Sequence, residues 1–198
     1  MPRISHLQGY DMNDDVRLAR RGTPRSDPPG SWDEHANAPL PGLSDGIAQY
    51  QRLHVDPSQL VIALPWYGYR FTCANNSRGA FCEIQGDQVH GCPRSACPQI
   101  SFGQIESLRT NRTAVGPVRW DNSTTSVFFD WFNGSGVRHQ VWYDNAETLA
   151  IKCTWAGRAR LRGIGSFLAT MLECTGCGPS AMNGSSAAMW AAFDSFKP

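Results

Sequence analysis

The sequence lacks an excess of charge of either sign and is poor in charged residues altogether. Its 198 residues contain 18 Lys plus Arg against 17 Asp plus Glu, and charged residues make up 18% of the chain. About 25% is usual in soluble domains. Balanced charge creates no long-range field that draws a protein to nucleic acid or acidic lipid. We therefore expect no nucleic-acid partner.

Long apolar runs are also missing. The longest, residues 60–66, is far shorter than the roughly 20 residues that cross a bilayer, so we expect no membrane partner. The first eight residues contain no apolar stretch of the roughly 7 to 15 residues that a signal peptide requires. Hydrophobic residues still make up 41% of the chain, which predicts one folded domain or part of a larger one.

Two patterns that are present are typical of the secretory pathway. Seven cysteines are ordinary in an oxidising compartment and frequent for a reducing one: Cys73, Cys82, Cys92, Cys97, Cys153, Cys174 and Cys177. The glycosylation pattern Asn-x-Ser/Thr occurs at Asn75, Asn111, Asn122, Asn133 and Asn183. We expect a lysosomal or extracellular location and disulfides of open pairing. Without an entry signal, these patterns predict that an N-terminal portion is missing from the sequence.

The chain alternates between helix-like and strand-like segments at both ends. Residues 13–43 are rich in Pro and Gly and predict a long loop. A helix is expected over 45–54 with Ser44 as its N-cap, followed by a parallel strand over 59–65 buried on both faces. This alternation predicts an α/β fold.

The middle of the chain has a different texture, with short aromatic segments and many Gly and Pro residues. Residues 66–143 predict an inserted, disulfide-stiffened α+β lobe, in which 125–131 and 138–142 form a hairpin. A helix over 145–159, capped by Asp144 or Asn145, then precedes a second buried strand over 161–168 and a terminal helix over 187–196.

Several segments together resemble glycoside hydrolase family 18, and within it the di-N-acetylchitobiase branch. They follow the family's order: Gly9-Tyr10-Asp11, Trp32 to Pro39, Leu64-Pro65-Trp66-Tyr67-Gly68-Tyr69 with Thr72-Cys73, His139 to Asn145, and Arg160 to Gly165. The resemblance implies the C-terminal part, about strands six to eight, of a (β/α)8 barrel. It divides the chain into partial barrel at 1–65, inserted lobe at 66–143 and partial barrel at 144–198.

The resemblance also implies a mechanism in which the sugar's own 2-acetamido oxygen attacks the anomeric carbon. The family's general acid is the Glu of an Asp-x-x-Asp-x-Asp-x-Glu strand, and this sequence contains no Asp-x-Glu triplet. We therefore expect no hydrolysis by this chain alone. By resemblance, Tyr10 would hydrogen-bond the acetamido group and Asp11 would contact the sugar or that network.

Aromatic residues form the expected sugar-contacting set. Trp66 and Tyr67 could stack on sugar faces or pack in the core, and Trp142 could line the cleft or be a buried core residue. Phe167 stands where the family commonly has a Trp beneath the reacting sugar, so it keeps a stacking face but loses the indole N–H. Leu168 stands where chitobiases tend to have a polar residue. We expect no metal and no cofactor, because disulfides explain the cysteine spacings better.

Three functions remain open. The first is the C-terminal portion of a hydrolase acting on β-1,4-linked N-acetylglucosamine, in chitooligosaccharides or the chitobiose core of N-glycans, and monomeric at full length. The second is an inactive, chitolectin-like binding protein for the same oligosaccharides. The third is a nonfunctional truncated product. The sequence does not separate them, nor does it give the preferred substrate length.

Overall fold

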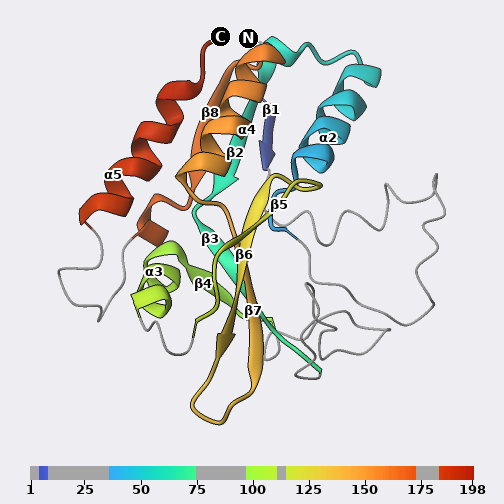
Figure 1. Ribbon diagram of the computed structural model, residues 1–198. Coiled ribbons are helices and arrows are strands. Elements are labelled where there is room, and N and C mark those ends of the chain that lie inside the picture. The colour runs from blue at the N-terminus through green and yellow to red at the C-terminus, as the bar shows by residue number, and fades with distance from the viewer. Residues whose placement is uncertain (1–4, 9–35, 75–96, 111–114, 173–182) are drawn as a thin grey trace.

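The computed structural model describes residues 5–8, 36–74, 97–110, 115–172 and 183–198. Two sheets organise these residues (Figure 1). The parallel sheet has the strand order β1-β2-β8, and the antiparallel sheet has the order β4-β3-β7-β6-β5. The strands are β1 Ser5–Gln8, β2 Leu60–Pro65, β3 Tyr67–Thr72, β4 Gln99–Ser101, β5 Arg119–Asp121, β6 Ser126–Phe132, β7 Arg138–Tyr143 and β8 Gly163–Phe167.

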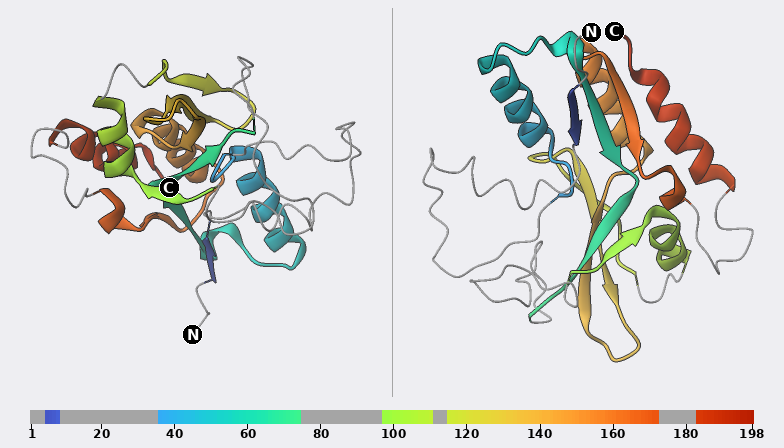
Figure 2. Two further views of the ribbon diagram at one scale, coloured as in Figure 1. Left: turned by 90° about the horizontal axis from the view of Figure 1, so that it is seen from below. Right: turned by 180° about the vertical axis from the view of Figure 1, so that it is seen from behind.

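Most of the helices pack on the parallel sheet (Figures 1 and 2). In the sequence they precede, interrupt and follow the strands of the antiparallel sheet. The α-helices are α2 Leu40–Arg52, α3 Phe102–Thr110, α4 Ala146–Arg158 and α5 Asn183–Ala192. Short 3-10 turns are η2 Pro57–Gln59, η3 Ala169–Leu172 and η4 Phe193–Ser195. Within the described ranges, none of the helices combines the length and apolar character needed to cross a membrane.

The parallel sheet is built on β2, which pairs with β1 on one side and β8 on the other. Leu60, Ile62 and Leu64 are buried against α2, α4 and α5, whereas Val61 and Ala63 on the opposite face are half-buried. The predicted parallel strand is confirmed. Burial on both faces is wrong, because the described helices pack on the face that carries the three larger side chains and leave Val61 and Ala63 half-buried. All five residues of β8 are likewise half-buried.

Helix α2 begins earlier than the sequence predicted. Its N-cap is Pro39, which makes no side-chain cap, and Pro41 lies in the first turn. The expected loop to residue 43 and the expected Ser44 cap are therefore both wrong at this point. Proline is tolerated in a first helical turn because the N–H that it lacks has no partner there. Leu40 donates its backbone N–H to Thr124 O at 2.9 Å, so a distant segment fixes the start of the helix.

Two local predictions are confirmed. Of the two candidates for the cap of α4, Asp144 and Asn145, the N-cap is Asn145, with a reciprocal capping box between Asn145 and Thr148. The predicted hairpin is formed by β6 and β7, which pair from Val127 opposite Tyr143 to Phe132 opposite Arg138. The terminal helix is also present, although it starts at residue 183 and ends in the turn η4.

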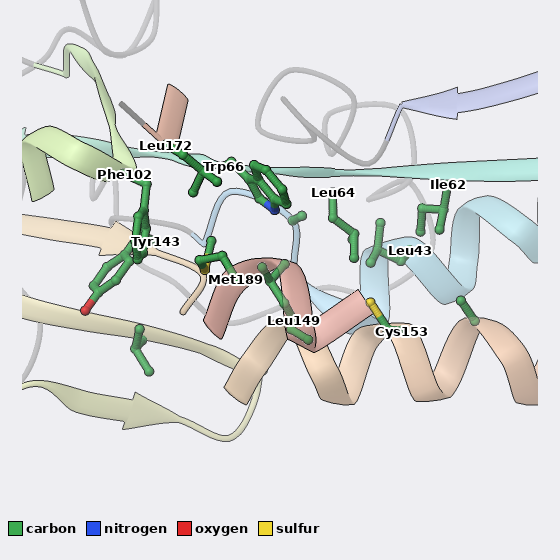
Figure 3. Close-up of a cluster of buried hydrophobic side chains, with 14 of the residues drawn as sticks. Leu43, Ile62, Leu64, Trp66, Phe102, Tyr143, Leu149, Cys153, Leu172 and Met189 are labelled. Carbon is green, nitrogen blue, oxygen red and sulfur yellow. The ribbon is translucent and has the colours of Figure 1, made fainter. Parts of the chain in front are cut away.

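The main hydrophobic core lies where the two sheets meet the helices. Figure 3 shows Trp66 near Met189 and Leu172, with Leu64 and Ile62 facing the helix that carries Leu149 and Cys153. Strands β3 and β7 of the antiparallel sheet come close together at Gly68, beside this core. A Cβ there would lie 2.3 Å from Trp142 O, so the β3–β7 contact requires glycine.

A buried ion pair joins the antiparallel sheet to α4. Lys152 Nζ lies 2.6 Å from Asp144 Oδ1, and the two side chains are 0% and 1% exposed. Thr148 Oγ1 donates to the same carboxylate oxygen at 2.8 Å, and Lys152 Nζ donates to Ser126 Oγ at 3.3 Å. Burial lowers the pKa of Lys152, and the Asp144 carboxylate opposes that shift. The pair therefore connects β6, the end of β7 and α4.

We expect Asp144→Asn to destabilise the chain by roughly 3 to 5 kcal/mol, because it leaves the Lys152 ammonium buried without a counter-charge. The matched control is Glu106→Gln, which breaks the more exposed Glu106–Arg109 pair and should cost less than about 1 kcal/mol. Urea unfolding at pH 7 measures both. Equal effects of the two substitutions would contradict this account of the buried pair.

Candidate functional site

The carboxyl ends of β2 and β8 meet the start of the antiparallel sheet. Pro65 and Phe167 are partners in the β2–β8 register, and Trp66 donates its backbone N–H to Phe167 O at 2.8 Å. The next residue, Tyr67, already belongs to β3. Side chains from two sheets therefore meet at this edge, where functional residues of parallel α/β folds are commonly found.

An aromatic row runs from this edge along β3. The ring centroids of Phe167 and Tyr67 are 6.4 Å apart, those of Tyr67 and Tyr69 are 5.9 Å apart, and those of Tyr69 and Phe71 are 6.1 Å apart. The last three residues share a face because side chains alternate along a strand. Tyr67 is buried, whereas Phe167 and Tyr69 are half-buried. The structure thus brings together two of the predicted site residues, Tyr67 and Phe167.

Asn37 lies beside this row and was not singled out from the sequence. Its side chain is 1% exposed, and its Nδ2 donates to Tyr67 O at 3.2 Å. Its Oδ1 is buried and has no hydrogen-bond partner. Ala36 and Ala38 on either side are also buried, each in a different hydrophobic cluster. The only signal for Asn37 in the sequence was its place in the family-like segment from Trp32 to Pro39.

Trp66 lies in the main core rather than at an open surface. It is 0% exposed, and its ring meets the edge of Trp190 at a centroid distance of 4.5 Å and Phe193 at 5.3 Å (Figure 3 shows its core surroundings). Of the two roles considered for Trp66, this geometry matches core packing. Its indole N–H is buried without a partner.

Trp142 lies in a second hydrophobic cluster, together with Phe71 and Phe128. It is 2% exposed and stacks on Phe128 at 4.3 Å with an interplanar angle of 9°. Its Nε1 donates to Gln140 Oε1, and Gln140 Nε2 donates to Asp130 Oδ1, each at 3.0 Å. The core alternative therefore fits Trp142 in the same way as it fits Trp66.

Other predicted residues fall partly outside the described ranges. Tyr10 and Asp11 lie outside them, and so do Asn75 and Asn111, whereas Asn183 begins α5. Asn122 is exposed between β5 and β6. Asn133 Oδ1 accepts hydrogen bonds from the backbone N–H groups of Ser135 and Val137 in the hairpin turn.

Two groups buried in the main core have pKa values raised far above neutral pH. Burial raises the pKa of Tyr143 to about 12, and burial also raises the pKa of the free Cys153 thiol to about 12. Cys73 and Cys97 are buried in the second cluster. Among the residues that the structure describes, no three His, Cys, Asp or Glu side chains gather as a metal site would require.

Three parallel strands with helices packed against them, and an antiparallel sheet beside them, make up part of an α/β fold. Residues 4–171 match the model of the family described as glycosyl hydrolases family 18. The chain belongs to this family, as the sequence resemblance predicted.

Two curated relatives are similar over most of the chain. Di-N-acetylchitobiase of Homo sapiens is 33% identical over 143 residues, which are 71% of this chain and 37% of that protein. Probable di-N-acetylchitobiase 1 of Dictyostelium discoideum is 32% identical over 169 residues, 81% of this chain and 43% of that protein. The chain thus spans about two-fifths of the length of these relatives.

Solved structures support the fold. A family 18 chitinase from Cycas revoluta in complex with (GlcNAc)3 has a TM-score of 0.59 at 23% identity, covering 84% of this chain and 43% of that one. The chitinase-like agglutinin RobpsCRA from Robinia pseudoacacia has a TM-score of 0.56 at 19% identity, covering 81% and 42%.

We expect Asn37→Ala to destabilise the chain by about 1 to 3 kcal/mol, because it leaves the Tyr67 carbonyl with one hydrogen bond fewer in a buried place. Asn37→Asp should be worse at pH 7, since a carboxylate cannot donate to a carbonyl and is costly to bury. Urea unfolding of both variants tests this. An Asn37→Ala variant as stable as the native chain would show that the hydrogen bond to Tyr67 is unimportant.

Proposed function

We propose that this chain is the C-terminal portion of a chitobiase- or chitinase-like hydrolase that acts on β-1,4-linked N-acetylglucosamine. The observation that carries the proposal is the meeting of Phe167 and Tyr67 at the carboxyl ends of two neighbouring parallel strands. The third parallel strand, β1, ends at Gln8, two residues before Tyr10. Because the three strands are parallel, β1 also ends on this side of the sheet.

The roles proposed for Phe167 and Tyr67 follow from their positions, and those proposed for Tyr10 and Asp11 follow from the family resemblance. Phe167 offers an aromatic face to the apolar face of a pyranose ring, and Tyr67 supports it from the side. Tyr10 would hydrogen-bond the substrate's acetamido group as its oxygen attacks the anomeric carbon, and Asp11 would contact the sugar or that network. Trp66 and Trp142 would act indirectly, by holding the strands that carry the contacting residues.

The proton for the leaving oxygen needs a carboxylic acid that this chain does not supply in the family's pattern. Its sequence has no Asp-x-Glu triplet. We therefore propose that these 198 residues bind substrate but do not hydrolyse it alone, and that the general acid belongs to a longer product. Residues 1–65 and 144–198 would be barrel portions, and 66–143 an inserted, disulfide-stiffened lobe.

A location in the secretory pathway, in the lysosome or outside the cell, belongs to the same proposal. Its support is the five glycosylation patterns and the seven cysteines. Of the two sequons whose side chains the structure describes, Asn122 is exposed and Asn133 is half-exposed in a turn, and both places suit surface glycans.

A binding-only function is the second candidate. The aromatic pair of Tyr67 and Phe167 is present while the Asp-x-Glu pattern is absent, which fits a protein that recognises N-acetylglucosamine oligomers without cleaving them. The similarity in fold to a chitinase-like agglutinin is compatible with this role. Hydrolysis by a longer product that contains the general acid separates the two candidates.

Titration of the chain with (GlcNAc)4, followed by isothermal calorimetry, tests the sugar site. We expect saturable binding that Phe167→Ala weakens by about tenfold, and that Phe167→Trp strengthens through its larger stacking face. The control is Trp120→Phe on β5, which makes an exposed aromatic side chain smaller at a position away from the aromatic row. Absence of binding at millimolar sugar, or equal binding by the Ala variant, would overturn the assignment.

A further inference from the structure

The two faces of the antiparallel sheet differ in how their charges are compensated. On the face of the aromatic row, Asp130 accepts hydrogen bonds from Arg119 and Arg138, each at 2.9 Å. The opposite face carries Arg70 and His139, and the residues that β3, β7 and β6 contribute to it include no acid. These residues are Gly68, Arg70, Thr72, His139, Val141, Tyr143, Val127, Phe129 and Trp131.

Arg70 and His139 meet at one aromatic ring. The Arg70 guanidinium carbon lies 5.3 Å from the centroid of the Trp131 ring, and the His139 ring centroid lies 4.9 Å from it. Thr72 is opposite His139 in the β3–β7 register, and its Oγ1 lies 3.2 Å from His139 Nδ1. Two donor-bearing side chains are therefore gathered beside a hydroxyl and an indole at the far end of this face.

Both side chains have a nitrogen without a hydrogen-bond partner. Arg70 Nε and His139 Nε2 are buried and unpaired, and His139 as a whole is 7% exposed. Within the described residues, Arg70 forms no ion pair. Buried donors without acceptors are unfavourable, and they are uncommon in native proteins. The described residues therefore offer no acceptor for hydrogen bonds from Arg70 Nε and His139 Nε2.

The charge state of the cluster favours an anionic acceptor. Burial lowers the pKa of His139, and the nearby Arg70 guanidinium lowers it further, so the imidazole is neutral at pH 7. When the Thr72 hydroxyl donates to Nδ1, the ring proton lies on Nε2 and makes it a donor. The guanidinium keeps its charge and presents several N–H groups in one plane, which suits the oxygens of an oxyanion.

We propose that Arg70 and His139 form a binding site for a tetrahedral oxyanion, a phosphate or sulfate group, on the face of the antiparallel sheet opposite the aromatic row. Arg70 is half-buried and makes the first contact. A turn of its guanidinium from Trp131 toward the anion lets His139 Nε2 donate as well. Thr72 positions the imidazole. The site is separate from the proposed sugar site and does not depend on it.

The test is a titration of the full chain with inorganic phosphate at pH 7, at ionic strength held constant with NaCl, observed through the Arg Nε–H signals in 1H–15N spectra. We expect the Arg70 signal to shift saturably. Arg70→Gln should weaken binding, measured by calorimetry, by at least about tenfold, because a charge-assisted contact is lost. Arg70→Lys, which keeps the charge without the planar fork, should give an intermediate affinity.

Matched arms and controls make the outcome specific. Arg158→Gln removes an exposed arginine at the end of α4 and should leave phosphate binding unchanged. Inorganic sulfate and acetate, tested in the same way, distinguish a sulfate group and a carboxylate from phosphate. No saturable shift with phosphate or sulfate would overturn the site, as would equal losses in the Arg70 and Arg158 variants. If Arg70→Gln does not fold, Arg70→Lys and His139→Gln carry the same comparison.

Discussion

One continuous segment, residues 60–72, belongs to two sheets, and the change of partner occurs at Trp66. Its backbone N–H is bound to Phe167 O at 2.8 Å, and its carbonyl accepts the N–H of Phe102 at 3.2 Å. The first bond ties it to the parallel sheet and the second to the start of α3. Because its ring is held in the core by Trp190 and Phe193, the angle between the two sheets is set where the aromatic row begins. The geometry of the candidate site therefore depends on a residue that is itself buried away from it.

The chain leaves the antiparallel sheet for α4 at Asp144, where an ion pair instead of an aromatic ring holds it in place. Asp144 follows the last residue of β7, and its carboxylate is paired with Lys152, which lies within α4. A buried pair of this kind gives little net stability, but it is strict about geometry, since either partner alone is strongly unfavourable. The chain thus passes from the parallel to the antiparallel sheet at Trp66, which is held by packing. It leaves the antiparallel sheet at Asp144, which is held by the ion pair. Together they fix both ends of the 66–143 segment against the parallel sheet.

Local signals in the sequence were sufficient for several elements and insufficient for the site. The β6–β7 hairpin was predicted, and the α4 cap was narrowed to Asp144 or Asn145, because turn and cap residues act within a few positions of themselves. The start of α2 was not, because Leu40 is anchored to Thr124, which is distant in sequence. For Trp66 and Trp142, the aromatic character is evident from the sequence, but the direction in which each side chain points is not. Asn37 belongs to no alternating or helical pattern of the sequence, so no local signal identifies it as the hydrogen-bond partner of Tyr67.

The alternation of side chains along a strand also explains why the charges of the antiparallel sheet divide as they do. Asp130 and Trp131 are adjacent in β6, yet they lie on opposite faces, so the acid that binds Arg119 and Arg138 is separated by the sheet from Arg70. A single-residue alternation therefore gives one face a closed network of acid, base, amide and stacked rings. The same alternation leaves the other face with a guanidinium whose described contact is the Trp131 ring. On the first face, Asp130 binds Arg119, Arg138 and Gln140 beside the aromatic row. On the other face, Arg70 Nε and His139 Nε2 find no partner among the described residues, so a group from outside the sheet would complete their hydrogen bonds.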